Sequence, residues 1–193
     1  LAMSDKVKPD LRTRVATSLN YPAAFPEETL RQVRGLVTAA VQAIGVRTGM
    51  AHTEVIVTGN GPKLVELGAR GGGGHIFHTI VEAVSGFNAP AQTARILTGM
   101  PITIPELTSN GAVYRFFTPP RGILREVRNL EAASCLEGVL DIGLTKNIGD
   151  LVGDFENSLH RTGFVVTKGQ TREAAIEVAD RAESVVKFIV DPC

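Results

Sequence analysis

The stretch that decides the predicted fold is HTEVIVTGNGPKLVELGARGGGGHIF, residues 52–77. It contains two runs rich in Val, Ile and Leu, 53–58 and 63–67, which are typical of β-strands. Between them lies Gly-Asn-Gly-Pro at 59–62, a strong turn pattern. The stretch therefore predicts a β-hairpin that leads into a glycine loop and then a helix.

Two acidic side chains are predicted to face each other across this hairpin. If the turn centres on Asn60, Glu54 lies opposite Glu66. Like charges directly opposite each other destabilise a strand pair, so one interpretation is that the register differs by one residue and both side chains point into water. The other is that a dication lies between them, because Mg²⁺ takes oxygen ligands, commonly one or two carboxylates plus substrate phosphates.

A glycine run follows the second acid. Arg70 comes four residues after Glu66, and Gly71, Gly72, Gly73 and Gly74 come next. Four consecutive glycines favour neither strand nor helix, and a flexible loop is the simplest interpretation. Bare backbone also lets N–H groups approach an anion closely, and a following helix presents its positive end. After E-x-x-x-R, the run predicts one wall of a phosphate or carboxylate site.

The pattern H-T-E, eleven residues, then E-x-x-x-R-x-x-G resembles the C-terminal half of the ATP-grasp fold. It is most similar to carboxylate–amine ligases such as the L-amino-acid ligases, and more distantly to biotin carboxylase and the purine-pathway carboxylases. The resemblance implies an α/β chain of the α+β type, with a mainly antiparallel sheet, packed helices and a small antiparallel lid. We expect residues 1–108 to form the C-terminal subdomain of the ATP-grasp fold and 109–193 to form the lid subdomain.

The same resemblance implies the cofactors and their ligands. ATP and Mg²⁺ (or Mn²⁺) are expected, with Glu54 and Glu66 as metal ligands that bridge to the phosphates. Apolar residues next to the two acids pack on adenine in this family, and the matching positions are Ile56 and Val65. The alternative for these two residues is ordinary sheet core.

The expected contacts with substrate follow from the resemblance and from position. Arg70 is the expected catalytic residue, because a guanidinium suits a carboxylate or phosphoryl oxygen. The backbone at 71–74 is expected to contact the substrate carboxylate or the acyl phosphate. His75 is predicted to meet substrate from its position at the end of the loop, whereas His52 and His78 are expected to be packing or outer residues.

Two departures limit the resemblance. Many ATP-grasp enzymes have Asn two residues after the second acid, where this chain has Gly68. This weighs against a biotin-carboxylase site and leaves a second metal open. The region around Asn20 also lacks the His found there in many amino-acid ligases, so substrate choice is not transferred.

Composition excludes several classes of protein. The 193 residues carry 20 acidic and 20 basic side chains, which argues against a nucleic-acid binder. No apolar run approaches the length of a membrane span. Cys135 and Cys193 are too few for a disulfide scaffold or a zinc site, so a cytoplasmic location is the expectation. The start at Leu1 predicts a piece cut from a longer protein, and the resemblance suggests a homodimer.

The remaining elements follow from periodicity and turn residues. Helices are expected over 26–44, 76–84, 89–97, 129–135 and from a cap at Thr171 to Ile189. Strands are expected over 12–19, 111–118, 123–128, 139–144 and 161–167.

Three functions remain open at this level. The first is an ATP-dependent ligase that joins a small-molecule carboxylate to an amine through an acyl phosphate, with this chain as its C-terminal part and inactive alone. The second is a carboxylase that phosphorylates bicarbonate. The third is a non-catalytic ligand-binding or assembly module.

Overall fold

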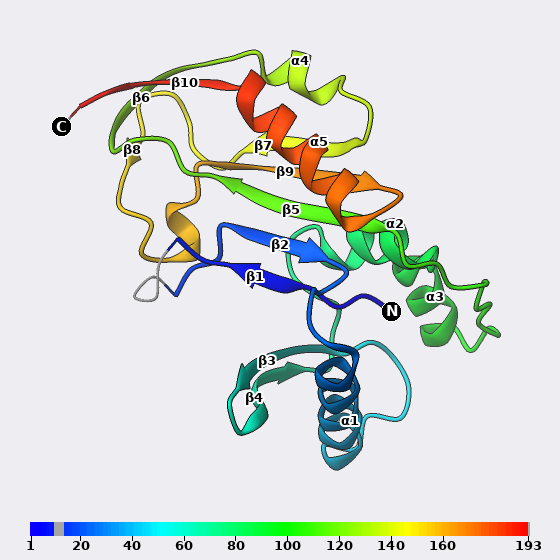
Figure 1. Cartoon of the computed structure of the whole chain (residues 1–193). Coiled ribbons are helices and arrows are strands. Elements are labelled where there is room, and N and C mark those ends of the chain that lie inside the picture. The colour runs from blue at the N-terminus through cyan, green and yellow to red at the C-terminus, as the bar shows by residue number, and fades with distance from the viewer. Residues whose placement is uncertain (10–13, 193) are drawn as a thin grey trace. The chain divides into compact units, whose positions relative to one another are not determined.

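The chain forms two compact units in a computed structural model that describes residues 1–9 and 14–192 (Figure 1). The hairpin unit comprises Ala24–Glu82 and Gly86–Leu107, and the sheet unit comprises Leu1–Ala23, Ala83–Ser85 and Thr108–Cys193. Within the described ranges, no helix combines the length and the hydrophobicity needed to cross a lipid bilayer.

The hairpin unit is built on two antiparallel strands and one long helix. Strands β3 (His52–Thr58) and β4 (Gly61–Gly68) pair with each other, and α1 (Glu27–Ala43) packs against both. Pro26 directly precedes α1, where its missing N–H removes no helical hydrogen bond. The helix predicted over 26–44 is thereby confirmed to within one residue at each end.

The chain after the hairpin is helical. A π-helical turn, η1 (Ile76–Ile80), continues into α2 (Val81–Ser85), and α3 (Ala89–Leu97) follows. The Asn88 side chain caps α3 by accepting a hydrogen bond of 2.9 Å from the N–H of Ala91. Both helices predicted here are confirmed, but the π-helical start of the first was not expected.

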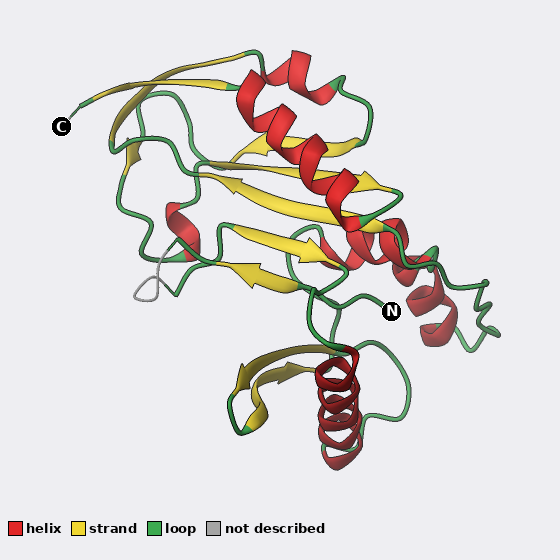
Figure 2. Cartoon of the chain, viewed as in Figure 1, coloured by secondary structure: helices red, strands yellow, loops and turns green. Residues whose placement is uncertain are grey.

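The sheet unit contains two antiparallel sheets (Figure 2). The larger has the order β1-β2-β5-β9-β7, with β1 (Asp5–Val7), β2 (Ser18–Tyr21), β5 (Gly111–Phe117), β9 (Gly163–Gly169) and β7 (Val139–Leu144). The smaller has the order β10-β6-β8, with β10 (Lys187–Asp191), β6 (Gly122–Arg128) and β8 (Leu151–Val152). The helices are α4 (Leu130–Ser134), the short 3₁₀ turn η2 (Ser158–His160) and α5 (Arg172–Val185). Antiparallel sheets with packed helices confirm the predicted fold class. The strand predicted over 12–19 lies partly outside the described residues, and within them the strand begins only at Ser18.

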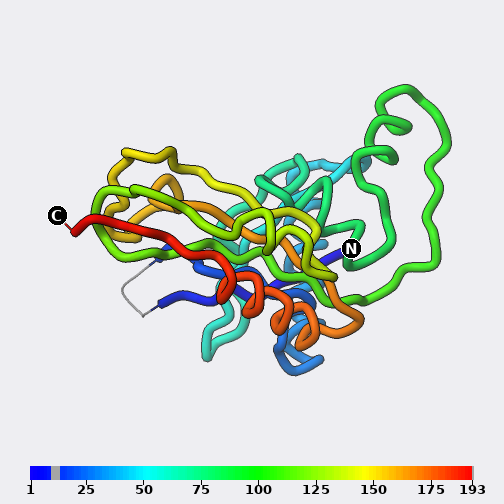
Figure 3. The backbone as a smooth tube through the Cα atoms, turned by 90° about the horizontal axis from the view of Figure 1, so that it is seen from above, coloured from blue at the N-terminus to red at the C-terminus, as the bar shows by residue number. Residues whose placement is uncertain are grey.

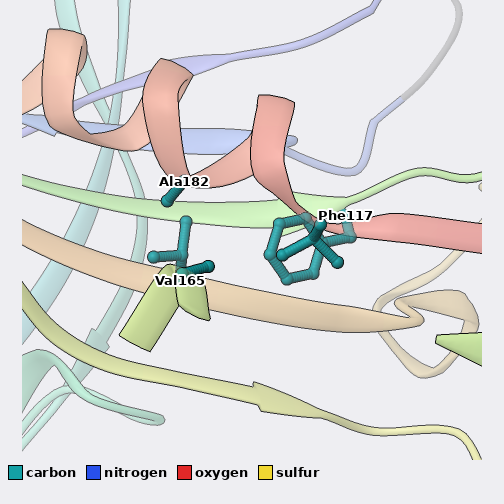
Figure 4. Close-up of a cluster of buried hydrophobic side chains, with 5 residues drawn as sticks. Phe117, Val165 and Ala182 are labelled. Carbon is teal, nitrogen blue, oxygen red and sulfur yellow. The ribbon is translucent and has the colours of Figure 1, made fainter. Parts of the chain in front are cut away.

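The core of the sheet unit lies under α5, which packs on β9 and β5. Three alanines on this helix are fully buried, which lets its backbone approach the sheet closely. Ala175 and Ala179 cluster with Val113 of β5. Ala182 belongs to a second cluster, shown in Figure 4: Phe117, Ala133, Val165, Ala182 and Val186. The predicted cap is confirmed, because the Thr171 hydroxyl accepts a hydrogen bond of 3.2 Å from the N–H of Ala174.

The end of the last helix was predicted wrongly. Its apolar face was expected to reach Ile189, but α5 ends at Val185 and the chain continues into β10, which pairs with β6 (Figure 3). Val186 already has extended backbone angles, φ −69° and ψ 132°. Pairing with β6 satisfies backbone groups that a longer helix would satisfy internally, so a distant strand overrides the local helical pattern.

The compact units do not follow one cut in the sequence. Residues 1–23 belong to the sheet unit, because β2 pairs with β5 and extends the larger sheet. One edge of the division falls near the predicted boundary at 108. The assignment of 1–108 and 109–193 as separate domains stays a prediction, since contact units are not the same as domains.

Candidate functional site

The two acids face each other as the hairpin pattern predicts. In the β3–β4 register Glu54 pairs directly with Glu66. A register shift follows immediately, so that Val55 pairs with Leu64 and Val65 is the extra residue of a β-bulge. Bulges locally increase twist and redirect side chains, and they are common next to active sites. The interpretation in which a one-residue slip separates the two acids is therefore wrong.

Each of the two acids also has a basic side chain within 4.0 Å. Arg70 Nη2 lies 3.6 Å from Glu66 Oε1, and His52 Nε2 lies 4.0 Å from Glu54 Oε1. The Glu66 and Arg70 side chains are 58% and 56% exposed, so their ion pair contributes little to folding stability. Both remain accessible to a ligand.

Gly68 makes room for the arginine. A Cβ placed on Gly68 would lie 3.3 Å from Cγ and 3.4 Å from Nε of Arg70. The Arg70 side chain thus lies over this glycine, and its Nη1 donates a 2.8 Å hydrogen bond to the Gly71 carbonyl oxygen. A larger side chain at this position would require the Arg70 side chain to shift by a few tenths of an ångström.

The four glycines of the loop have different structural roles. A Cβ on Gly71 would lie 2.4 Å from the Phe77 ring, and a Cβ on Gly72 would lie 2.6 Å from Ile76 Cγ2. Gly74 has a positive φ of 58°, which favours glycine. Gly73 differs, because nothing lies within 4 Å of its added Cβ. Packing and backbone conformation thus account for three of the glycines, and Gly73 is the exposed, open position of the loop.

The helix after the loop begins with an unusual turn. His75 occupies the N-cap position of η1, and its ring centroid lies 5.1 Å from that of His78. The Ile76 N–H donates a 3.3 Å hydrogen bond to the Gly73 carbonyl oxygen. π-Helical turns are frequent at functional sites. The contact of His75 with substrate stays a prediction.

The two residues expected to pack on adenine are not part of a hydrophobic core. Ile56 and Val65 are 54% and 55% exposed. Ile56 lies two residues after Glu54 and therefore continues its face of β3, whereas Val65 is the bulge residue beside Glu66. Their exposure leaves both side chains available for contact with a ligand.

The carboxylates of Glu54 and Glu66 fit a magnesium ion whose other ligands are phosphates and waters. Among the described residues no group of three or more His, Cys, Asp or Glu side chains is arranged to hold a metal by itself. Mg²⁺ is commonly held by one or two carboxylates, with substrate phosphates and waters completing its shell. Glu54 and Glu66 supply two facing carboxylates and no nitrogen or sulfur ligand, as this coordination requires.

A polar cavity lies within the sheet unit. It has a volume of about 530 Å³, and charged side chains dominate its lining, including Arg121, Lys146, Asp154 and His160. Arg121 Nη1 bonds Asp154 Oδ2 at 3.2 Å, with both side chains largely exposed. Elsewhere in this unit, Arg115 is 16% exposed and pairs with Asp180 and Glu183 of α5.

Comparisons with known proteins agree with this architecture. Residues 115–191 match the family described as L-amino acid ligase C-terminal domain 2. The crystal structure of L-amino acid ligase from Bacillus licheniformis superposes with a TM-score of 0.84 at 22% identity, covering 99% of this chain and 48% of that one. Phosphoribosylglycinamide synthetase from Anaerococcus prevotii gives 0.79 at 18%, covering 98% and 49%.

A carboxylase also shares the fold. The biotin carboxylase domain of 2-oxoglutarate carboxylase from Hydrogenobacter thermophilus, a dimer in complex with MgADP, ADP and bicarbonate, gives a TM-score of 0.63 at 14% identity, covering 92% of this chain and 40% of that one. No curated protein matches the chain in sequence. The chain spans about half the length of the solved structures it matches.

These similarities define the class of fold. The chain has the fold of the C-terminal part of ATP-grasp ligases, as the hairpin pattern indicates. More particularly, its residues 115–191 are similar to the second C-terminal domain of L-amino acid ligases. Glu54, Glu66 and Arg70 lie outside that matched range, so their assignment rests on the hairpin geometry.

Proposed function

We propose that this chain is the C-terminal part of an ATP-dependent carboxylate–amine ligase. The observation that carries the proposal is the direct pairing of Glu54 with Glu66 beside Arg70 and the glycine loop. A purely structural hairpin gains nothing from opposed carboxylates, because like charges directly across a strand pair repel. A bound dication removes that repulsion and gives the pair a use.

Each residue has a defined role in this proposal. Glu54 and Glu66 hold Mg²⁺, which when bound gathers the negative charge of the nucleotide phosphates. Arg70 contacts the carboxylate or phosphoryl oxygen where negative charge develops, for which its planar fork is suited. The loop at 71–74 supplies backbone N–H groups to the same anion, His75 contacts substrate, and Ile56 and Val65 pack on adenine.

The proposed reaction has two balanced steps. A carboxylate oxygen of the first substrate attacks the γ-phosphorus of ATP, and the bond to the bridging oxygen breaks to release ADP. The amine nitrogen of the second substrate then attacks the acyl carbon, loses a proton and releases inorganic phosphate. Both steps move charge between oxygens, which fixed cations and backbone dipoles stabilise.

Two kinds of comparison support a ligase over a carboxylase. The match over 115–191 is to an L-amino acid ligase domain, and the superposition on a ligase has a TM-score of 0.84 against 0.63 for the biotin carboxylase domain. Gly68 also replaces the Asn that many ATP-grasp enzymes have there. The identity of the carboxylate and amine is left to the assay.

The decisive experiment compares Glu→Gln substitutions at two positions, made in the longer protein of which this chain is the proposed C-terminal part. With Mg²⁺, ATP, an amino acid and an amine, wild type should release ADP and phosphate and form an amide. Glu66→Gln should lower turnover at least tenfold, the scale known even for outer partners of metal sites. Glu131→Gln on α4 is the matched control and should leave turnover unchanged, because it lies outside the proposed site.

The outcomes separate the alternatives. Wild-type turnover in Glu66→Gln contradicts the metal role. Bicarbonate-dependent ATP hydrolysis without an amine indicates a carboxylase instead. Failure of the protein to bind Mg²⁺ or nucleotide indicates a non-catalytic module. We also expect the 193-residue chain by itself to lack ATPase activity.

A further inference from the structure

Four residues share one face of the β3–β4 hairpin. His52 pairs with Gly68, and Glu54 pairs with Glu66, with one residue between successive members on each strand. Side chains two residues apart on a strand point to the same face, and directly paired residues share that face. The histidine is therefore placed beside the acid pair, at the end nearer the glycine loop.

The His52 ring contacts two parts of the site at once. Its Nε2 lies 4.0 Å from Glu54 Oε1. Its Nδ1 lies 3.0 Å from the position that a Cβ on Gly72 would take, so the ring also lies against the glycine loop. The side chain is 25% exposed, compared with 58% for Glu66, so the ring is the more enclosed of the two. One rigid ring thus lies between the carboxylate and the loop.

We propose that His52 is a positioning residue that sets the spacing between Glu54 and the loop at Gly72. The proposal rests on the proposed function, in which the acid pair holds the metal and the loop holds the anion bound to it. Those two halves must keep one separation if a metal-bound phosphate is to reach both. Partners of metal ligands orient them in this way, and their loss commonly weakens metal binding ten- to hundredfold.

Two substitutions separate the two contacts of the ring. In shape, the amide nitrogen of Gln reaches the place of Nε2, whereas the shorter Asn reaches only the place of Nδ1. His52→Gln should therefore keep the polar contact with Glu54 and alter the contact with Gly72. His52→Asn should do the reverse, and His52→Ala should lose both.

The test uses the 193-residue chain with Mn²⁺ as the probe. Mn²⁺ affinity is measured by electron paramagnetic resonance, and the environment of Gly72 is followed by its amide resonance in ¹⁵N-glycine-labelled protein without metal. We expect His52→Asn to lower Mn²⁺ affinity about tenfold with little change at Gly72. His52→Gln should shift the Gly72 resonance and keep an affinity close to that of wild type.

A matched control and a companion variant make the result decisive. His160→Gln, in the sheet unit, should change neither readout. If the Asn and Gln variants bind Mn²⁺ equally well while Glu66→Gln loses binding, the role of His52 is contradicted and the metal site stands. Unchanged binding in Glu66→Gln, or a wild-type chain that binds no Mn²⁺, contradicts the proposed metal site and the role of His52 with it.

Discussion

The two compact units contain charged side chains with opposite kinds of partner. In the sheet unit, Arg172 lies between the carboxylate of Asp5 and two backbone carbonyls, and its side chain is 14% exposed. In the hairpin unit, Glu54 faces the carboxylate of Glu66, and Nε2 of the His52 ring lies 4.0 Å from Glu54 Oε1. A partly buried arginine thus bonds its carboxylate in the sheet unit, whereas two like charges face each other across the hairpin.

Apolar side chains show the same contrast. The sheet unit encloses Phe117 and Val165 at 1% and 0% exposure. The hairpin leaves Ile56, Leu64 and Val65 between 43% and 55% exposed. Arrangements that do not help a protein fold tend to persist where a ligand or partner makes use of them. We therefore expect substitutions in the sheet unit to change stability and substitutions on the hairpin face to change binding.

Removing the buried arginine should have the largest effect. Arg172 Nη1 and Nη2 bond the two Asp5 carboxylate oxygens at 2.6 and 3.0 Å, and Nη1 also bonds the carbonyl oxygens of Asn20 and Pro22. Arg172→Ala leaves these acceptors without their donor and should lower the free energy of unfolding by about 3 kcal/mol, measured by urea denaturation. Arg125→Ala, which removes an exposed pair with Asp191, should cost less than about 1 kcal/mol. Equal losses of unfolding free energy in the two variants would contradict the stabilising role given to the Arg172–Asp5 pair.

The exposed arginine should show the reverse pattern. Arg70→Ala should lower turnover of the full ligase about a hundredfold, because it removes a donor from developing negative charge. The side chain is 56% exposed, so the free energy of unfolding should change by less than about 0.5 kcal/mol. Arg95→Ala is the control in the same unit, since Arg95 lies on α3 outside the proposed site and its Nε donates a hydrogen bond of 2.6 Å to the Pro101 carbonyl oxygen. A hundredfold loss in that control would mean that the assay reports folding and not the site.

Within the hairpin unit, two neighbouring glycines should differ in their effects on stability and on binding. Gly72→Ala forces a Cβ to within 2.6 Å of Ile76 and should destabilise the chain by about 1–3 kcal/mol in thermal unfolding. Gly73→Ala meets nothing within 4 Å and should leave stability unchanged. If the loop holds an anion, Gly73→Ala should still weaken nucleotide binding, measured by calorimetry. Unchanged affinity in Gly73→Ala would remove this position from the proposed site.

A buried tyrosine gives the smallest effect, confined to alkaline pH. Tyr21 on β2 is 3% exposed, and burial raises the pKa of its hydroxyl, while a hydrogen bond with Ser4 acts in the opposite direction. The unfolded chain therefore ionises first, so stability is complete below about pH 10 and falls as pH rises toward the folded pKa. Tyr21→Phe should make the free energy of unfolding decline less steeply between pH 9 and about pH 11, measured by urea denaturation. An identical decline in both proteins would show that Tyr21 does not contribute.

Much of the site could be predicted because its main parts are close in sequence. Only eleven residues separate Glu54 from Glu66, and a single turn brings them together, so turn residues and alternation were enough to predict the pair. Helices α1 and α3 were predictable for a similar reason, since their apolar spacing and end residues act within a few turns. The roles of these residues in binding and catalysis remain predictions.

The parts that could not be predicted depend on distant contacts. Whether residues 187–191 form helix or strand is settled by β6, about sixty residues earlier in the chain. The partner of Arg172 is 167 residues away, and β2 joins a sheet whose next strand begins at Gly111. No local pattern encodes these pairings, because several strands and acids have similar propensities and only packing selects among them.

The sequence by itself determined that two neighbouring strands each carry an acid, that an arginine and a glycine run follow the second one, and that helices flank the hairpin. The register that places the two acids opposite each other came from the structure. Only the tertiary structure decided that Gly68 accommodates the Arg70 side chain, that Gly72 lies against His52, and that Gly73 stays open. The physical reason is the range of each interaction. Backbone hydrogen bonds and turns act between near neighbours, whereas the space around a side chain depends on every segment that packs near it.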